Sequence, residues 1–539
     1  MAVIAAATIA AVATASSPVA VSVNPSPFAT SACAAIDSAQ TSKVPGIYNY
    51  LNSEVEPWVA VDPTDGSHLV GAWQQDRWND GGANGLASAF SMDGGSSWTE
   101  VALPFTSCYG AGGLDYQRAS DPWLSIGPGK PASFGCAATA KDCSTVYQIA
   151  IPFDETSKRT AVAASVSYDG GAHYTNTQTL IADPCSGVQT PGYVCNNPKA
   201  FFLNDKESIT ADPTQPGYAY AVWDRLVAPP ASAPGFFHEL AYKGPSYISR
   251  TTDYGKTWSA PEQIVKTPSV DQTIGNVIVV DSRNGDLYNF FAYIQNISSN
   301  GGNQGASIGF VKSTDHGVTW GKRQTVTADR AIGVFDPNNL DPTTNTAPAP
   351  LRTAGGLPQP VIGANGQLYV VWEGLNSATG TDQAYITTST DGGANWSTPS
   401  IVNSAYTSRP AYTPSVAIAP NGTVGVTYYQ WDAPTSSGLE PTVLYLQKSS
   451  SAGSSSTAPT FGARTAVSSE FNGLAAPFAE GYFLGDYEGL AANASGFIPF
   501  NVLSTCDDGS CLALTSVTNP ANLTPTNKNS TDVYAFPGS

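Results

Sequence analysis

The stretch Ser91–Trp98, SMDGGSSW, follows a run of alternating residues typical of a β-strand and turns on two glycines before a tryptophan. Nearly the same eight letters return at Thr251–Trp258 (TTDYGKTW), Ser313–Trp320 (STDHGVTW) and Ser389–Trp396 (STDGGANW). A degenerate copy, SYDGGAHY, runs from Ser167 to Tyr174. The recurrence of one strand and turn indicates a repeat architecture, in which each unit packs on its neighbours.

A second pattern runs between these turns: a short strand, a turn rich in Pro, Asn, Asp or Gly, and a strand that often ends at tryptophan. It is clearest in four copies: EPWVAVDPTDGSHLVGAW from Glu56, ESITADPTQPGYAYAVW from Glu207, PQPVIGANGQLYVVW from Pro358 and TPSVAIAPNGTVGVTYYQW from Thr413. Weaker copies near Asp121, Gln272 and Asp486 bring the number to seven, spaced by 54 to 86 residues. Radial stacking of such units predicts an all-β fold, a β-propeller of four-stranded antiparallel blades. Seven blades are preferred, with six as the alternative.

The composition agrees with a turn-rich chain of this kind. Charged residues make up 12% of the sequence, which also holds 51 glycines and 40 prolines, so helix is expected to be minor. Lys and Arg number 24 against 42 Asp and Glu, a formal net charge of −18. Because this charge repels phosphate backbones and anionic membrane surfaces, we do not expect nucleic acid as a partner.

The first 15 residues form an apolar run that ends in the small-x-small pattern of a signal-peptide cleavage site. We therefore expect a signal peptide at 1–15, a flexible leader at 16–45 and a single propeller domain at 46–539. The protein is expected to be secreted and monomeric. No later segment approaches 18 uninterrupted apolar residues, so no membrane span is expected.

The eight cysteines support export. Six of them form three close pairs: Cys136 with Cys143, Cys185 with Cys195, and Cys506 with Cys511. Cys33 and Cys108 remain as a long-range pair, and an even number of paired cysteines predicts disulfides in an oxidising compartment. A metal site is less favoured because C-x-x-C pairs are missing and histidines number only four, so we expect neither metal nor cofactor.

The boxed turn resembles the Asp-box, or BNR repeat, of the sialidase family, with the pattern Ser/Thr-x-Asp-x-Gly-x-x-Trp. Its aspartate can accept backbone N–H bonds across the turn and its glycine supplies positive φ, so the motif itself is structural. The matching aspartates are Asp93, Asp169, Asp253, Asp315 and Asp391. The resemblance implies a carbohydrate-active propeller whose partner is a glycan or polysaccharide.

In a propeller the first strand of each blade lines the central channel, so the residues that enter those strands converge at one face. The entry segments and the loop after the first hairpin carry a set of charged and aromatic residues: Asp76, Arg77, Trp78, Arg118, Asp121, Lys206, Glu207, Trp223, Arg225, Arg409, Glu480, Tyr482, Asp486 and Glu488. Such side chains can pair with one another and join blades. They can also form a carbohydrate site, in which Arg binds a carboxylate, aromatic rings stack on sugars and acids transfer protons.

The resemblance to sialidases implies a Tyr nucleophile, because an anionic nucleophile would repel the carboxylate of the sugar. Tyr482 then serves as nucleophile, with Tyr429 and Tyr487 as rivals, Glu207 as its partner and Asp76 as acid/base. The carboxylate clamp and the sugar contacts are assigned to Arg118, Arg225, Arg409, Trp78 and Trp223, with Arg77 as the substitute for Arg118. The family's F/Y-R-I-P motif is absent, since EPWVAV has Glu56 where an arginine is wanted.

The sequence leaves three classes of function open. They are an exo-acting glycoside hydrolase of sialidase type, a non-catalytic carbohydrate-binding or adhesion propeller, and another carbohydrate enzyme such as an arabinan hydrolase or a uronate lyase. His238 in GFFHELAYKG, or a Tyr, is the candidate base of a lyase. A sialidase requires three guanidinium groups in one pocket and a Tyr hydroxyl near a Glu, whereas a two-carboxylate glycosidase requires acids roughly 5 to 9.5 Å apart.

Overall fold

The computed structural model describes residues 17–22, 24–135, 143–157, 159–183, 201–228, 243–268, 271–296, 303–340, 348–353, 355–434, 440–505 and 529–539. Within these ranges the chain is all-β, with one α-helix and several four-stranded antiparallel sheets, as predicted. No helix in the same ranges is long and apolar enough to cross a membrane. His238 and five of the cysteines lie outside the described residues: Cys136, Cys185, Cys195, Cys506 and Cys511.

Sets of four strands follow one another along the chain. The first set is β2 (Asn49–Val61), β3 (Leu69–Trp78), β4 (Ala83–Ser91) and β5 (Thr99–Ala102). The second is β6 (Arg118–Pro128), β7 (Ser144–Phe153), β8 (Thr160–Ser167) and β9 (Thr175–Asp183). Pairing of Ala83 with Ala119 joins these two sets into one sheet. The third set is β10 (Phe201–Ala211), β11 (Ala219–Ala228), β12 (Ser246–Thr251) and β13 (Glu262–Val265).

The remaining sets repeat the arrangement. The fourth is β14 (Asp271–Val280), β15 (Leu287–Asn296), β16 (Asn303–Ser313) and β17 (Gln324–Asp329), and the fifth is β20 (Gln359–Ile362), β21 (Leu368–Asn376), β22 (Thr381–Ser389) and β23 (Ser400–Ile401). The sixth is β24 (Ala411–Ile418), β25 (Val424–Trp431), β26 (Pro441–Lys448) and β27 (Thr465–Ala466), with β28 (Phe471–Asn472) also paired to β26. The seventh is β30 (Gly489–Asn493), β31 (Gly496–Thr505), β32 (Ser530–Ala535) and β1 (Val19–Ala20). A separate small sheet contains β18 (Val334–Leu340), β19 (Pro348–Arg352) and β29 (Tyr482–Phe483).

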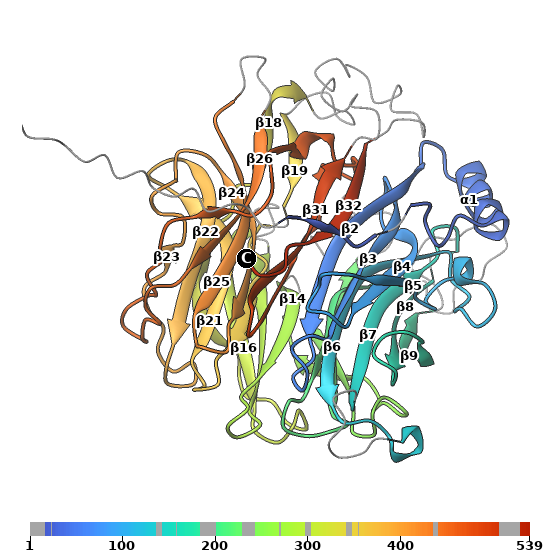
Figure 1. Ribbon diagram of the computed structural model, residues 1–539, viewed down its shortest axis with the longest axis horizontal. Coiled ribbons are helices and arrows are strands. Elements are labelled where there is room, and N and C mark those ends of the chain that lie inside the picture. Colours follow the sequence, from blue (N-terminus) through green and yellow to red (C-terminus); the bar gives the residue numbers. More distant parts are fainter. Residues whose placement is uncertain are drawn as a thin grey trace, which may run out of the picture.

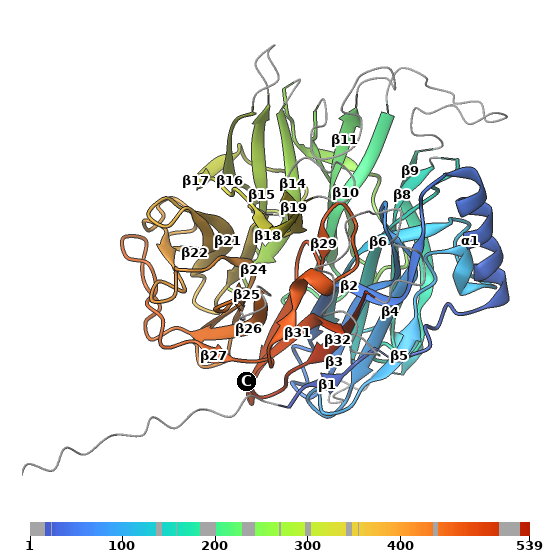
Figure 2. The same ribbon diagram turned by 90° about the horizontal axis from the view of Figure 1, so that it is seen from above.

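The first strands of the seven sets contact one another in chain order. β2 contacts β6, and the contacts continue through β10, β14, β20, β24 and β30, which contacts β2 again. Figure 2 shows the sheets arranged around a centre, with β18, β19 and β29 toward the middle of the view. Residues near the ends of the first strands are therefore brought close together in space.

The hydrogen bonds of the first Ser or Thr hydroxyl and of the aspartate recur in every copy of the boxed turn. In the first, the Ser91 hydroxyl donates to Asp93 Oδ1 (2.8 Å) and accepts from the Gly95 N–H (2.9 Å). Asp93 Oδ1 also accepts from the Ser97 N–H (2.9 Å), and Trp98 Nε1 donates to the Gly95 carbonyl (3.0 Å). The aspartate contacts recur at Asp169, Asp253, Asp315 and Asp391. The boxes thus close the turns that follow the third strands.

Replacing Asp315 with Ala is expected to lower the free energy of unfolding by about 1–2 kcal/mol, since the carboxylate accepts bonds from the Thr319 hydroxyl and from the Val318 and Thr319 N–H groups. Hydrogen bonds from the Thr319 hydroxyl and N–H hold the pKa of Asp315 at about 2. This contribution is present above the unfolded pKa near 4 and is lost as the pH falls through 2. Urea unfolding at neutral pH measures the loss, with Asp115→Ala, whose side chain is 92% exposed, as control. Equal losses in the two variants would contradict the structural role.

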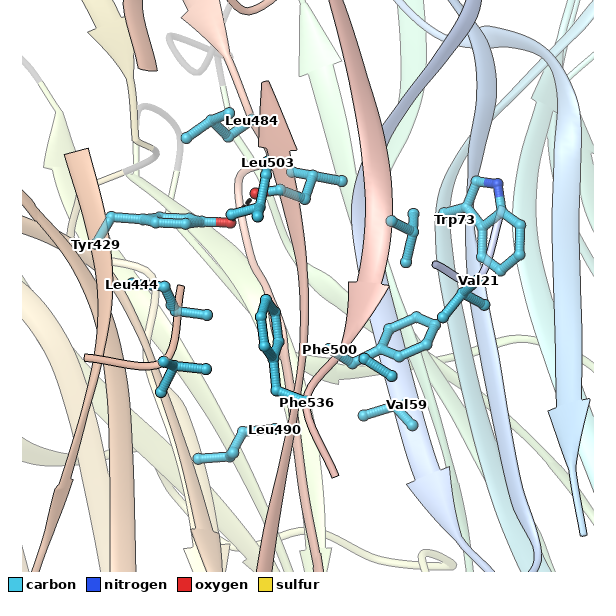
Figure 3. Close-up of a cluster of buried hydrophobic side chains, with 14 of the residues drawn as sticks. Val21, Val59, Trp73, Tyr429, Leu444, Leu484, Leu490, Phe500, Leu503 and Phe536 are labelled. Carbon is cyan, nitrogen blue, oxygen red and sulfur yellow. Dashed lines mark hydrogen bonds between the residues drawn. The ribbon is translucent and has the colours of Figure 1, made fainter. Parts of the chain in front are cut away.

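Within the segment expected to be a flexible leader, 16–45, the described residues 17–22 and 24–45 include a strand and a helix that contact the rest of the fold. β1 pairs antiparallel with β32, with Val19 opposite Ala535, and so completes the seventh sheet. Directly after β1, Val21 enters an apolar cluster that includes Trp73 and Phe500. Figure 3 shows these side chains together with residues of the sixth and seventh sheets, including Tyr429, whose hydroxyl donates to the Val502 carbonyl (2.6 Å). Val21, directly after β1, is buried, and it anchors this two-residue strand, whose own residues are half-buried or exposed.

The same segment contains the helix α1 (Ser31–Lys43), which lies on the outside of the molecule (Figure 1). The Thr30 hydroxyl caps it by accepting from the Cys33 N–H (3.1 Å). Cys33 forms the predicted disulfide with Cys108. Only Cys33 and Gln40 of the helix are buried, so it has no apolar stripe that the sequence could reveal. A cap and a covalent bond, rather than amphipathic packing, position this helix.

Candidate functional site

A β-bulge interrupts five of the first strands at an equivalent position. In each bulge one residue has positive φ: Glu56 (54°), Asp121 (54°), Lys206 (46°), Gly275 (73°) and Thr413 (47°). Positive φ is costly for residues other than glycine, by about 1–3 kcal/mol each, and bulges redirect the side chains that they contain. Three of these five side chains are ionisable, and Lys206 contacts both Glu56 and Asp121.

Lys206 is the central residue of a charged cluster that also contains Glu56, Asp121 and Asp486. Its Nζ lies 2.9 Å from Asp121 Oδ2, 2.7 Å from Asp486 Oδ2 and 3.5 Å from Glu56 Oε1. Burial opposes all of these charges, but the two aspartates and Glu56 hold the pKa of Lys206 well above its usual value. Burial acts to raise the pKa of Asp121, but the charge of Lys206 opposes it and the pKa is lowered. The charges of Arg352 and Lys206 likewise oppose burial at Asp486 and lower its pKa. Lys206, Asp121 and Asp486 are therefore ionised together.

Two guanidinium groups border the cluster. Arg352 binds Asp486 through two nitrogens, at 3.0 and 2.5 Å. Both Arg352 and Arg77 lie over the Phe483 ring, 4.4 and 4.6 Å from its centroid. Burial and the charge of Arg352 lower the pKa of Arg77 to about 10. Arg352 and Arg77 thus both interact with other side chains of the protein.

Other carboxyl groups beside Lys206 have raised pKa values. Burial raises the pKa of Glu56 to about 8, and the charge of Asp121 adds to this shift. Burial also raises the pKa of Asp205 to about 7, although the charge of Lys206 opposes this shift. Glu207 is 2% exposed, and burial followed by Asp121 raises its pKa well above the usual value. The site therefore combines ionised and protonated carboxyl groups, the condition for acid and base catalysis at one pH.

Glu207 lines a small cavity with Tyr487, one of the two rival tyrosines. The Tyr487 hydroxyl donates to the Pro122 carbonyl (2.9 Å), and its ring packs against Trp123 at 5.1 Å between centroids. Burial raises the pKa of Tyr487 well above its usual value. Tyr482, in contrast, lies in β29 with its ring 5.3 Å from that of Phe478. Of the candidate nucleophiles, Tyr487 is thus the one beside Glu207.

A larger cavity of about 390 Å³ opens next to Lys206, and we call it the axial pocket. Its walls come from Lys206, Ile274, 292–294, 305–306, 329–331 and 355–357. Gly356 has φ +92° and lies directly against the Asp329 carboxylate, so a side chain at this position would collide with it. The pocket thus lies between the end of β17 and the segment that precedes β20.

Asp329 is the acidic residue in the pocket wall. It is 7% exposed, and its Oδ1 has no hydrogen-bond partner among the described residues. Burial, and then the charge of Asp382, raise the pKa of Asp329 to about 7. Asp382 in turn accepts the backbone N–H groups of Ile332 (2.9 Å) and Gly333 (2.7 Å) and so holds the adjoining loop. A carboxyl group that is half protonated near neutral pH suits general acid catalysis.

The structure does not bring the three clamp arginines together. Arg118 donates to Asp80 (2.7 Å) and lies over Trp78, and Arg225 donates twice to Asp183 (2.9 and 2.6 Å). Arg409 pairs with Glu440 at the sixth sheet. Because each guanidinium is bound to a different carboxylate, the predicted clamp on a sugar carboxylate is not assembled.

Three more predicted site residues are fully buried. Asp76 accepts the Ser26 hydroxyl (2.7 Å) and the Asn52 N–H (2.8 Å), and so anchors the N-terminal segment. Trp78 and Trp223 are each 0% exposed, which corrects their assignment as sugar-stacking rings. A ring without exposed surface cannot contact a bound sugar.

Among the described residues, Cys33, Asp37 and Cys108 offer ligand atoms within 4.8 Å of one another. The two sulfur atoms are joined in a disulfide, and metal binding to cysteine requires thiolates. In the oxidised protein this group therefore offers only the Asp37 carboxylate.

Asp329, Arg352 and the bulge at Glu56 were not predicted from the sequence. Asp329 ends a fourth strand, and Arg352 belongs to the β18–β19 insertion, so neither lies in a repeated first-strand motif. A signal for the bulges did exist, because Glu56, Asp121 and Thr413 each precede a proline in the entry segments. Proline has no N–H to donate to a strand ladder, so within a sheet it is confined to edge strands, strand starts or bulges, and it marks an irregular point in the strand.

No family model and no curated protein matches the chain. Similar solved structures include an α-L-arabinanase from Penicillium chrysogenum, with 15% identity over 70% of this chain and 88% of that one, at a TM-score of 0.41. An α-L-arabinofuranosidase from Fusarium graminearum has 15% identity, coverages of 73% and 92% and a TM-score of 0.41. A Hadza microbial sialidase has 14% identity, coverages of 78% and 71% and a TM-score of 0.38. Likeness at this level does not decide the function of the chain.

Proposed function

We propose that the chain is a secreted, seven-bladed β-propeller that hydrolyses glycosidic bonds in the axial pocket. The return of first-strand contacts from β30 to β2 supports closure, and the boxed turns, which resemble the sialidase repeat, support a carbohydrate substrate. The Cys33–Cys108 disulfide supports an oxidising compartment.

One observation carries the catalytic part of the proposal: Lys206, which binds Asp121 and Asp486, lines the axial pocket together with Asp329, whose Oδ1 has no hydrogen-bond partner among the described residues. Glycoside hydrolysis uses such a pair, one acid to protonate the leaving oxygen and one carboxylate to act as base or nucleophile. Asp329 is the general acid in this proposal. The second role belongs to Asp121 or Asp486, the ionised carboxylates that Lys206 binds.

The same charges favour a neutral glycoside, such as an arabinofuranoside, over a sialoside. Lys206 and Arg352 are already paired with Asp121 and Asp486, and a sugar carboxylate would have to displace these partners. The arginines assigned to the clamp are bound elsewhere. An enzyme of sialidase type is therefore the less favoured form of the proposal.

Turnover of fluorogenic glycosides tests the function directly. The panel contains an α-L-arabinofuranoside, an α-sialoside and common pyranosides. We expect hydrolysis of a neutral substrate by the wild type and its loss in Ala331→Trp, which fills the axial pocket from its wall. Ser404→Trp adds the same bulk at an exposed residue that lines neither this pocket nor the cavity at the sixth sheet, and it should retain turnover. A folded wild type that cleaves nothing in the panel, or an Ala331→Trp variant of full activity, would refute the proposal.

A further inference from the structure

A second cavity, of about 560 Å³, lies at the end of the sixth sheet. We call it the sixth-sheet pocket. Its charged and aromatic walls are Tyr406, Arg409, Trp431, Asp432, Arg464 and Glu470. None of its lining residues belongs to the axial pocket. Arg409 precedes β24 and Trp431 ends β25, so the pocket lies where the first hairpin of this sheet begins and ends.

Arg464 is held in a fixed orientation within this pocket. Its guanidinium carbon lies 4.3 Å from the Tyr406 ring centroid and 3.8 Å from that of Tyr445. It also donates to the Gln430 side chain and to Asp432 Oδ1 (3.1 Å). A guanidinium that is fixed before a ligand arrives loses little conformational entropy on binding.

The charges of the pocket favour a neutral ligand over an anionic one. Arg409 is paired with Glu440 and Arg464 with Asp432, while Glu470 adds an exposed carboxylate. The lining supplies two carboxylates and two guanidinium groups, and Glu440 behind Arg409 adds a third carboxylate, so an incoming anion would have to compete with carboxylates already in place. A neutral ligand that both donates and accepts hydrogen bonds can use the two kinds of group together.

We infer that the sixth-sheet pocket is a second carbohydrate site that binds a neutral oligosaccharide without cleaving it. Sugar hydroxyls donate to Asp432 and Glu470 and accept from the guanidinium groups, while Tyr406 supplies an apolar surface. The volume lies within the range of small-molecule sites. This inference goes beyond the proposed hydrolysis and does not depend on it, because the two pockets share no residue.

Calorimetric titration with arabinotriose, xylotriose and maltotriose tests the site, with sialyllactose as an anionic comparison. The titrations use the Ala331→Trp protein, so that the axial pocket is filled. We expect saturable binding of a neutral trisaccharide, weakened at least about tenfold by Tyr406→Ala and by Ser408→Trp, which fills the pocket from an exposed position. Ser404→Trp adds the same ring to an exposed residue that does not line the pocket, and should leave binding unchanged.

Three results would overturn the inference. They are an absence of binding by all three neutral trisaccharides, tighter binding of sialyllactose than of any neutral sugar, and equal affinities of the Ser408→Trp and Ser404→Trp proteins. Because these measurements follow binding in a protein with a filled axial pocket, they are independent of whether the axial pocket hydrolyses glycosides.

Discussion

Replacing Asp329 with Asn is expected to lower kcat/KM on the neutral glycoside by about 10²–10⁴-fold, the contribution that a positioned general acid makes. Asn keeps the size of the side chain over Gly356 but has no carboxylic proton to give to the leaving oxygen. The KM should change little, since the residue acts on the leaving oxygen in the transition state. Steady-state kinetics with purified protein measure both constants. The variant Asp115→Asn, at a side chain 92% exposed, serves as control.

The dependence of activity on pH distinguishes a general acid from a residue that only shapes the pocket. The pKa of Asp329 is raised to about 7 by burial and by Asp382, so the group is protonated below pH 7 and ionised above it. Activity of the wild type should therefore fall as the pH rises through about 7, and Asp329→Asn should lack this limb. A variant that loses less than about tenfold in rate, or that keeps the basic limb, would remove Asp329 from the mechanism.

The repeats made most of the fold predictable. The starts inferred near Glu56, Asp121, Glu207 and Thr413 fall within β2, β6, β10 and β24, because each follows from a strand, a turn and a strand that the sequence repeats. The boxed turns were predictable for the same reason, since one aspartate satisfies several N–H groups within a few residues. Local patterns decide these features, and local patterns are visible in a sequence.

The choice of partners for buried charges was not predictable in this way. Arg118 and Arg409 belong to polar entry segments like that of Lys206, yet of these residues only Lys206 reaches carboxylates of β2, of β6 and of the segment between β29 and β30. Its reach depends on the bulge in β10, which gives the residue positive φ. Asp329 depends on the segment after β17, whose course follows no repeat. Such partnerships are set by the packing of distant strands.

Replacing Lys206 with Met is expected to destabilise the protein by about 3–5 kcal/mol at neutral pH, because Asp121 and Asp486 would be left buried with less compensation. Met retains much of the apolar length of the side chain, so most of the loss comes from charge. Lys312→Met is the matched control. Lys312 pairs with Asp286 at the same distance, 2.7 Å, but is 29% exposed, and its loss should stay below about 1 kcal/mol. Denaturant unfolding of both variants measures the difference.

The pH dependence and a double replacement identify charge as the cause. Lys206 lowers the folded pKa of Asp121 and Asp486, so the stability from these pairs is present above the unfolded pKa near 4 and is lost as the pH falls through the folded values. In Lys206→Met these aspartates take up protons more readily, and the deficit against the wild type should shrink in acid. Adding Asp121→Asn to Lys206→Met removes one uncompensated charge, and it should restore part of the lost stability. Equal losses of stability in Lys206→Met and Lys312→Met would mean that the charged cluster around Lys206 does not stabilise the fold. A stability difference between Lys206→Met and the wild type that does not change with pH would mean the same.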